Sequence, residues 1–228
     1  MTNLETLIKE LEFKTPPSEI NTNDHPTLVG FLEKEKQYRE QAKIKRLLRQ
    51  SGLKTIKTFS QFDWSFNPKT PKEEIMAFAR SDWITQAANL VLIGDAGLGK
   101  SHLAKSLCYE AILKGYPTAF ITTFDLISKI KKSLYSTTLV DHYGRIAVLC
   151  LDELGYTYHK KEDTDLIFQI ISKRGETRPT IVTTNLIPKE WGTIFSGSAA
   201  SAILDRLSLN GKFMALEGKS YRLNLRRI

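Results

Sequence analysis

The chain has 228 residues, of which 41% are hydrophobic and 25% are charged, and its net charge at pH 7 is +8. No run approaches the roughly 18 consecutive apolar residues of a membrane span, and the first residues lack the basic and apolar segments of a secretion signal, so we expect a cytoplasmic protein without a membrane span. Two cysteines and four scattered histidines argue against a disulfide framework and against a metal site built from protein ligands alone.

The first 68 residues carry no strand signal, and we interpret residues 1–68 as a helical N-terminal arm for partner or DNA interaction. A long charged helix pattern runs from about Pro26 to Gln50. Residues 41–57 contain no acid, and Ile44, Leu47 and Leu48 keep helical spacing there, which predicts a basic amphipathic helix. Its basic residues are Lys43, Lys45, Arg46, Arg49, Lys54 and Lys57.

Two further basic clusters follow, and together the three favour a polyanionic partner. The second cluster is Lys129, Lys131 and Lys132, and an acid-free stretch near the end of the chain holds Lys219, Arg222, Arg226 and Arg227. Nucleic acid is the natural candidate. Blocks of like charge also occur as solvated or protein-docking faces, so that alternative stays open. The candidate DNA contacts are Lys43, Lys45, Arg46, Arg49, Lys129, Lys131 and Lys132.

Residues 54–68 form an aromatic-rich irregular stretch, here named the aromatic segment, which we interpret either as a clasp between arm and core or as a packed loop. The core, residues 69–228, begins with Thr70-Pro71-Lys72-Glu73. Thr70 can cap a helix, Pro71 suits the first helical position and Glu73 can complete a capping box. We therefore expect a helix from this point.

Apolar β-type runs alternate with helical patterns along the core. The runs cover residues 90–93, 119–122, 146–151 and 180–184, and apolar spacing near 3.6 covers residues 100–113, 124–134 and 163–173. This alternation predicts an α/β fold with a central parallel sheet and helices on both faces.

Residues 94–101 read Gly-Asp-Ala-Gly-Leu-Gly-Lys-Ser and directly follow the first apolar run; we name them the phosphate loop. A triphosphate requires converging backbone N–H groups, a helix N-terminus and a mobile counter-charge. The glycines permit close approach, Lys100 can reach the β- and γ-phosphates, and the Ser101 hydroxyl can bind Mg²⁺. The sequence thus predicts binding of a nucleoside triphosphate with Mg²⁺, with ATP contacts at Gly94, Asp95, Ala96, Gly97, Leu98, Gly99, Lys100, Ser101 and His102.

Polar residues at the ends of later strands complete a candidate hydrolysis site. Asp152 and Glu153 end the third run, where Asp152 suits Mg²⁺ and Glu153 suits the base that activates water. Asn185 follows the fourth run and is expected either to orient that water or to form a local turn. Arg206 is interpreted either as a surface arginine or as one that reaches the γ-phosphate of a neighbouring subunit.

The order of motifs closely resembles the IstB family, AAA+ helper ATPases of bacterial insertion sequences that are related to the helicase loaders DnaC and DnaI. The likeness runs from about Thr58 to Leu223. It rests on the phosphate loop, Cys-Leu-Asp-Glu-Leu-Gly-Tyr (150–156), Thr-Thr-Asn (183–185), Ala-Ile-Leu-Asp-Arg-Leu (202–207), Gly-Lys-Ser-Tyr-Arg-Leu (218–223) and Ser-Phe-Asn-Pro (65–68). The resemblance implies an AAA+ P-loop fold, Asp152 and Glu153 as Walker B acids, Asn185 as sensor 1 and Arg206 as a trans-acting arginine finger.

The resemblance also implies an ATP-dependent oligomer that grips duplex DNA with little sequence preference and assists a cognate transposase. Family members commonly have Gly-Pro-Pro-Gly at residues 94–97, the region 134–146 is shorter here, and the first 55 residues match weakly. The chain stops soon after Arg222, so we expect no C-terminal lid domain, closure of the nucleotide mainly by a neighbouring subunit, and slow, concentration-dependent ATP hydrolysis. The alternative to a transposition helper is a helicase loader whose partner is a replicative helicase, and a small-molecule kinase is a third hypothesis.

Overall fold

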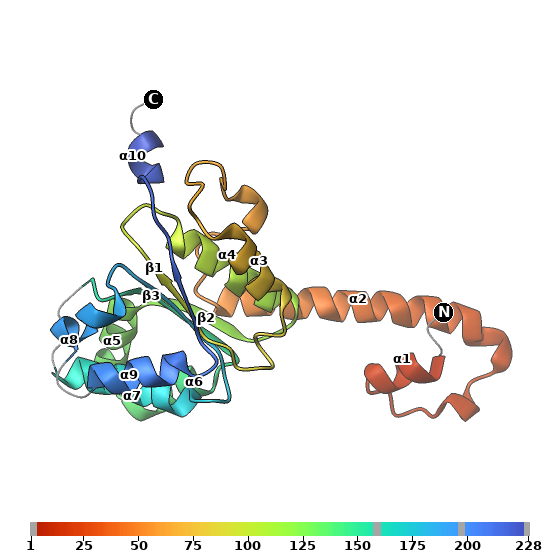
Figure 1. Cartoon of the computed structure of the whole chain (residues 1–228). Coiled ribbons are helices and arrows are strands. Elements are labelled where there is room, and N and C mark those ends of the chain that lie inside the picture. Colours follow the sequence, from red (N-terminus) through yellow and green to blue (C-terminus); the bar gives the residue numbers. More distant parts are fainter. Residues whose placement is uncertain (1–3, 157–160, 196–198, 226–228) are drawn as a thin grey trace. The chain divides into compact units, whose positions relative to one another are not determined.

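The computed structural model describes residues 4–156, 161–195 and 199–225 (Figure 1). Contacts divide the chain into two compact units, Met1–Leu47 and Leu48–Ile228. The aromatic segment, which the sequence analysis assigned to the arm, thus lies in the larger unit. Its Phe59 is buried, and Phe62 and Trp64 pack against the same apolar cluster as α3 (Lys72–Arg80) and α4 (Lys100–Leu113), because these large side chains gain most by leaving water.

The first unit is a helical hairpin-like element built on one apolar cluster. It contains α1 (Leu4–Glu10), two 3₁₀ turns (Pro17–Glu19 and Thr22–Asp24) and the N-terminal part of α2 (His25–Gln50). The cluster's buried side chains are Leu4, Leu7, Ile8, Leu11 and Leu32. The predicted long helix corresponds to α2, but the predicted basic helix over 41–57 ends at Gln50, so that Lys54 and Lys57 lie beyond it.

The second unit is built on a five-stranded parallel sheet in the order β2-β3-β4-β1-β5. Its strands are β1 (Leu90–Ile93), β2 (Thr118–Thr122), β3 (Val148–Leu154), β4 (Thr180–Thr184) and β5 (Lys212–Ala215). The four predicted strands are confirmed. The prediction missed β5, in which only Met214 is buried, because an edge strand of four residues gives no apolar run.

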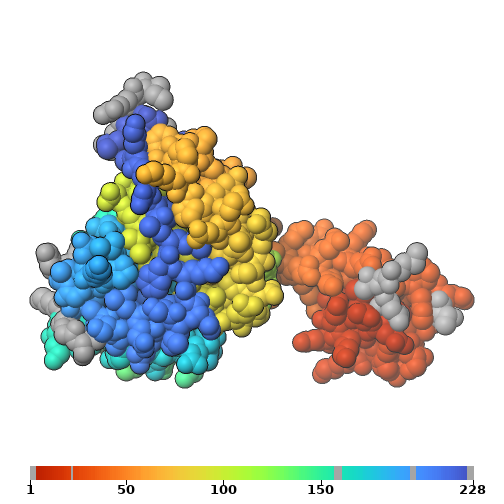
Figure 2. Space-filling model, in the orientation of Figure 1, coloured from red at the N-terminus to blue at the C-terminus, as the bar shows by residue number. Residues whose placement is uncertain are grey.

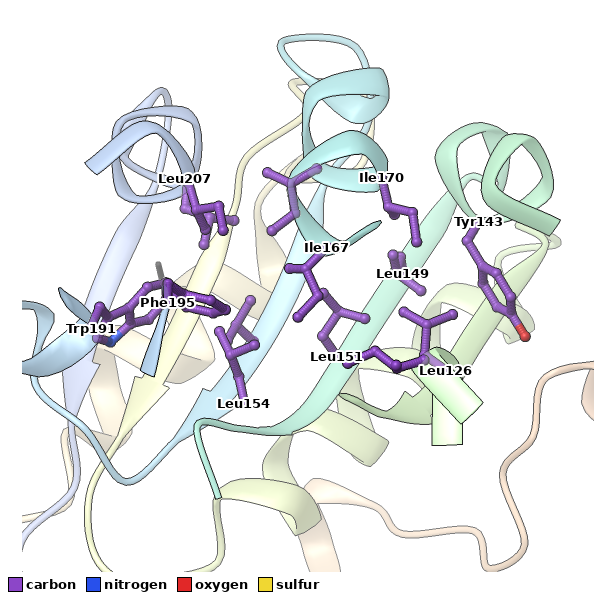
Figure 3. Close-up of a cluster of buried hydrophobic side chains, with 14 of the residues drawn as sticks. Leu126, Tyr143, Leu149, Leu151, Leu154, Ile167, Ile170, Trp191, Phe195 and Leu207 are labelled. Carbon is purple, nitrogen blue, oxygen red and sulfur yellow. The ribbon is translucent and has the colours of Figure 1, made fainter. Parts of the chain in front are cut away.

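Alternate side chains of the central strands face opposite helical layers. Leu90, Leu92 and Cys150 pack against α3 (Lys72–Arg80) and α4 (Lys100–Leu113). Val91 and Leu151 belong to the opposite cluster, which Figure 3 shows. That face is covered by α5 (Thr123–Lys132), α6 (Ser136–Arg145), α7 (Lys161–Arg174), α8 (Trp191–Ile194) and α9 (Ala199–Ser208) (Figure 1). The α/β architecture with helices on both faces is confirmed.

Two details of the helices differ from the sequence predictions. Pro71, rather than Thr70, is the cap residue of α3; Thr70 is buried and its carbonyl accepts a hydrogen bond from the Lys72 backbone, so its side chain does not cap the helix. The helices α6, α8 and α10 (Tyr221–Leu225) were not predicted. Among the described helices, none is long and apolar enough to cross a membrane.

Arg174, at the end of α7, is a buried cation held by neutral acceptors. Its guanidinium donates to Thr180 Oγ1 and to the carbonyls of Tyr143, Ile146, Ala147 and Pro179. Burial, with a smaller contribution from the charge of Arg178, lowers the pKa of Arg174 to about 9. These bonds tie the segments that enter β3 and β4 to one another at the edge of the sheet where the strands begin.

Candidate nucleotide-binding site

The phosphate loop connects β1 to α4 and depends on glycine at two crowded positions. Gly97 and Gly99 have φ angles of 87° and 93°, in the left-handed region that other residues rarely adopt. A Cβ on Gly97 would lie 2.0 Å from Ser220 Oγ, and one on Gly99 would lie 2.4 Å from Phe62 Cε2. The loop therefore requires glycine for its backbone conformation and for close contact with two other parts of the chain.

Lys100 is the first residue of α4 and is 6% exposed. Its ammonium group donates to the carbonyls of Gly94 and Asp95, over 2.5 and 2.8 Å. Burial lowers the pKa of Lys100, and the nearby Asp152 carboxylate acts in the opposite direction. The charge is thus held inside the loop by carbonyl groups, which phosphate oxygens can replace.

Ser101 and Asp152 bring the loop and β3 together. The Ser101 hydroxyl donates to Asp152 Oδ1 over 2.8 Å, and Asp152 is 5% exposed. A hydroxyl and a carboxylate are oxygen donors of the kind that Mg²⁺ prefers. No three His, Cys, Asp or Glu side chains of the described residues converge on a metal position. The pair therefore fits an ion that arrives with a nucleotide and completes its shell from phosphate and water.

A β-bulge places Asp152 and Glu153 at the same site. Leu151 pairs with Val182 and Leu154 with Thr184, so three steps along β3 face two steps along β4. Consecutive residues of a regular strand point to opposite faces, and a bulge re-aims one of them. Glu153 has a φ of 60° and lines the pocket beside the phosphate loop. Both acids thereby face the nucleotide region although they are adjacent in sequence.

A cavity of about 300 Å³ lies beside the phosphate loop. Parts of the phosphate loop, the aromatic segment and the C-terminal end of the sheet form its walls. The lining residues outside the loop and helix α4 are Lys57, Gln61, Phe62, Asp63, Phe66, Asn67, Glu153, Tyr156, Thr183, Tyr221 and Arg222. The cavity has the size and the mixture of apolar and charged walls that suit a small-molecule ligand.

The residues after β5 close this pocket from within the chain. We name residues 216–222 the C-terminal strap. The Leu216 backbone donates to the Ile93 carbonyl over 2.7 Å, and the Tyr221 backbone donates to the Gly97 carbonyl over 3.0 Å. Figure 2 shows the strap, in blue, against the aromatic segment, in orange. Tyr221 and Arg222 line the pocket in the same chain, so part of its wall comes from the strap, and closure mainly by a neighbouring subunit remains a prediction.

His102 was predicted to contact the nucleotide, and the structure gives it contacts to the aromatic segment. Its Nε2 lies 2.9 Å from the Thr58 carbonyl oxygen, and its ring meets Phe62 edge-on at a centroid distance of 5.3 Å. Burial is the main cause that lowers the pKa of His102. The ring also lines the pocket, so its nucleotide contact stays a prediction.

Asn185 and Arg206 are not brought together with the other predicted residues. Asn185 is exposed just beyond β4 and is absent from the pocket lining. The Arg206 guanidinium lies 4.9 Å from the Phe168 ring centroid and donates to the Ala202 carbonyl. Their expected roles as water-orienting residue and trans-acting arginine remain predictions.

Sequence reasoning missed Thr183, Phe62, Tyr221 and Arg222 as pocket residues. Thr183 belongs to the Thr-Thr-Asn motif, but of this motif only Asn185 was predicted to be a site residue. Arg222 was noted as a member of a basic cluster without a location. The aromatic residues could be placed only with the contacts of the folded chain, since the aromatic segment and the strap are far apart in sequence.

The candidate DNA contacts fall into two groups. Lys43, Lys45, Arg46 and Arg49 are exposed on α2. In the α5 cluster, Lys131 forms an ion pair with Asp163 and Lys129 donates to the Tyr143 hydroxyl over 3.2 Å, so two of its three cations are engaged within the fold. Arg226 and Arg227 lie outside the described residues.

Comparison with known proteins identifies the family. The family model of the IstB-like ATP binding proteins matches residues 2–228. An insertion sequence IS232 putative ATP-binding protein from Bacillus thuringiensis subsp. berliner is 35% identical over 86% of this chain and 80% of its own length. An IS5376 putative ATP-binding protein from Geobacillus stearothermophilus is 34% identical over 88% and 82%.

Among solved structures, the DnaC helicase loader aligns with a TM-score of 0.57 at 22% identity, over 76% of this chain and 99% of that one. This likeness shows the fold, which is that of the AAA+ P-loop proteins. With the phosphate loop, the bulged acid pair and the match along the whole chain, the protein belongs to the family of IstB-like ATP binding proteins.

Proposed function

We propose that this protein is a Mg²⁺-dependent ATPase that oligomerises on duplex DNA and assists transposition. The observation that carries the proposal is the bulge in β3, which brings Glu153 to the pocket wall while Asp152 is bonded to Ser101 of the phosphate loop. A protein that only binds a nucleotide needs the loop and its lysine. A carboxylate aimed at the same pocket adds the group that hydrolysis requires.

In this mechanism, the loop's N–H groups and Lys100 bind the β- and γ-phosphates. Ser101 and Asp152 would hold Mg²⁺, which would neutralise charge at the phosphates. Glu153 orients a water molecule and takes its proton while the water oxygen bonds to the γ-phosphorus and the bond from that phosphorus to the β,γ-bridging oxygen breaks, so that ADP and inorganic phosphate leave. Asn185 helps to orient that water, and Arg206 of a neighbouring subunit reaches the γ-phosphate and stabilises the charge that develops there.

The proposed DNA partner rests on charge. The chain has a net charge of +8, and the basic residues of α2 are exposed. Contacts to phosphates fix position without reading bases, which fits sequence-tolerant binding to duplex DNA. The assistance to a transposase rests on the insertion-sequence relatives. The alternative is a helicase loader, which the likeness to DnaC supports. A helicase loader would differ from a transposition helper in the protein that the arm binds and in a preference for single-stranded DNA.

The enzymatic part is tested by phosphate release from ATP with Mg²⁺ in the wild type, Lys100→Ala and Glu153→Gln. We expect Lys100→Ala to abolish nucleotide binding, and Glu153→Gln to retain binding while losing at least about a hundredfold in turnover. Glu217→Gln, a charge change at an exposed residue of the strap outside the pocket lining, is the matched control. Turnover of Glu153→Gln equal to that of the wild type contradicts the proposed base.

The DNA part is tested by fluorescence anisotropy of matched random-sequence duplex and single-stranded DNA, titrated with protein and a non-hydrolysable ATP analogue with Mg²⁺. Nucleotide-dependent preference for duplex supports the transposition role. Preference for single strands, or no DNA binding, favours the helicase-loader alternative. Turnover per subunit that stays flat over a wide dilution series contradicts a requirement for the oligomer.

A further inference from the structure

Thr183 lies on β4 directly opposite the bulge that carries the two acids. The pairs Leu151–Val182 and Leu154–Thr184 flank it, so it is the one β4 residue that faces both Asp152 and Glu153. It is 1% exposed over the whole residue, yet it forms part of the pocket lining. This is the place on β4 where a polar side chain meets the proposed catalytic groups.

The Thr183 hydroxyl makes one hydrogen bond to each acidic residue, as the donor to Asp152 and as the acceptor from Glu153. Its Oγ1 donates to Asp152 Oδ1, which also accepts the Ser101 hydroxyl over 2.8 Å. The same Oγ1 accepts the backbone N–H of Glu153 over 3.0 Å. One hydroxyl thus fixes the direction of the Asp152 carboxylate and satisfies the backbone of a residue whose φ is 60°.

Both bonds bear on the geometry that hydrolysis needs. A non-glycine residue in the left-handed region is disfavoured, and such a conformation persists only where its surroundings hold it. The hydrogen bond from the Glu153 backbone N–H to Thr183 Oγ1 stabilises this conformation of Glu153. The bond to Asp152 leaves that carboxylate turned toward Ser101 and the phosphate loop.

We propose that Thr183 is a positioning residue that couples the two acids: its hydroxyl orients Asp152 for Mg²⁺ and keeps the bulged backbone in the conformation that aims Glu153 at the pocket. The inference rests on the proposed ATPase function for its effect on turnover. Its effect on Mg²⁺ binding does not depend on hydrolysis.

Other threonines of β4 show that burial alone does not give this role. Thr184 is 0% exposed and its hydroxyl accepts the Leu186 backbone N–H over 3.1 Å. Thr180 is 1% exposed and its hydroxyl accepts from Arg174 at the opposite end of the strand. Only the hydroxyl of Thr183 among these three contacts the acids, so Thr184 provides a matched control on the same strand.

The test compares Thr183→Val, which keeps shape and removes the hydroxyl, with Thr183→Ser, which keeps the hydroxyl. Binding of a fluorescent non-hydrolysable ATP analogue is measured in EDTA and along a Mg²⁺ titration, followed by kcat with ATP. For Thr183→Val we expect unchanged affinity in EDTA, a Mg²⁺ midpoint raised by about tenfold and a kcat lowered by about tenfold or more. Thr183→Ser restores both quantities, and Thr184→Val leaves the Mg²⁺ midpoint unchanged.

Thermal melting of each variant separates a loss of fold from a loss of positioning, and Thr183→Ala replaces the valine variant if that one does not fold. A wild-type Mg²⁺ midpoint and kcat in folded Thr183→Val overturn the inference. A loss of analogue binding in EDTA that serine does not rescue also overturns it, because packing alone then explains the residue. If the wild type hydrolyses no ATP but the midpoint still shifts, the proposed hydrolysis fails and the positioning of Asp152 stands.

Discussion

Asn67 and Lys219 hold each other by two reciprocal hydrogen bonds: the Asn67 side-chain amide donates to the Lys219 carbonyl, and the Lys219 backbone N–H donates to Asn67 Oδ1, each over 2.9 Å. One residue belongs to the aromatic segment and the other to the C-terminal strap. Beside them, Phe66 and Tyr221 meet edge-to-face at a centroid distance of 5.0 Å. These contacts join the aromatic segment to the C-terminal strap, and both segments line the pocket beside the phosphate loop.

Asn67→Ala removes both side-chain bonds and is expected to release nucleotide faster. Since an intramolecular hydrogen bond contributes about 1 kcal/mol, we expect dissociation to accelerate by about five- to thirtyfold, with a smaller change in association. Stopped-flow displacement of a fluorescent ATP analogue measures this rate. Lys219→Ala is the control, because Lys219 contacts Asn67 only through its backbone, which this substitution keeps. Equal dissociation rates in Asn67→Ala and wild type contradict a closing role for the strap.

Nucleotide affinity is expected to fall at alkaline pH because of Lys100. Burial lowers the pKa of Lys100, so in the free protein this group loses its proton below its usual value of 10.5. Bound phosphates favour the charged form, so binding takes up a proton once the pH exceeds the lowered pKa, and affinity declines from there upward. Titrations of the ATP analogue over increasing pH test this. The Lys100→Arg variant keeps its charge at alkaline pH, so it should bind the analogue more weakly than the wild type but with an affinity that depends less on pH. An affinity that falls as steeply with pH as in the wild type contradicts the assignment of this effect to Lys100.

Arg174→Ala is expected to destabilise the second unit by about 3 kcal/mol or more, because it leaves buried carbonyl groups and the Thr180 hydroxyl without their donor. Urea unfolding measures the free energy of unfolding. The nearby Arg178 donates to Thr177 and is not fully buried, so Arg178→Ala is expected to change stability by no more than about 0.5 kcal/mol. Similar effects of the two substitutions contradict the structural role of Arg174.

The basic residues of α2 are expected to contribute to the salt dependence of DNA binding. Replacing Lys45, Arg46 and Arg49 by alanine should reduce the magnitude of the negative slope of log K against log salt by up to about 2.7, since each phosphate contact contributes about 0.9. Lys131, which is paired with Asp163, provides a comparison: Lys131→Ala should leave the slope nearly unchanged, well below the change of about 0.9 that the loss of one phosphate contact gives. An unchanged slope in the triple variant identifies α2 as a protein-docking or solvated face.

The sequence predicted those parts of the molecule in which local pattern and tertiary role agree. The phosphate loop is marked by its glycines and lysine, the helix from Lys100 to Leu113 by its apolar periodicity, and the strand that carries Asp152 and Glu153 by an apolar run followed by two acids, each within a short window. The resemblance to the IstB family arose from the same windows, and the match over residues 2–228 confirms it.

Features that depend on distant segments escaped prediction. The edge strand β5 has too little buried surface to show a pattern, and Thr70 has the composition of a cap while the folded chain buries it. The bulge is invisible in an unbroken apolar run because register is a property of two strands. For the same reason the sequence did not place Thr183 beside the acids, whereas Asn185 could be proposed from its position at the end of the fourth apolar run.

The position of β1 in the sheet has a consequence for biosynthesis. Leu90 pairs with Ile181 of β4 on one side and with Lys212 of β5 on the other, so both neighbours of β1 come from the second half of the chain. A nascent chain that ends before β5 leaves one edge of β1 unpaired and lacks the strap over the phosphate loop. Because these distant pairings form late, we expect the chain to become able to retain nucleotide only once β5 and the strap have been synthesised, and a chain truncated before β5 to lack this ability.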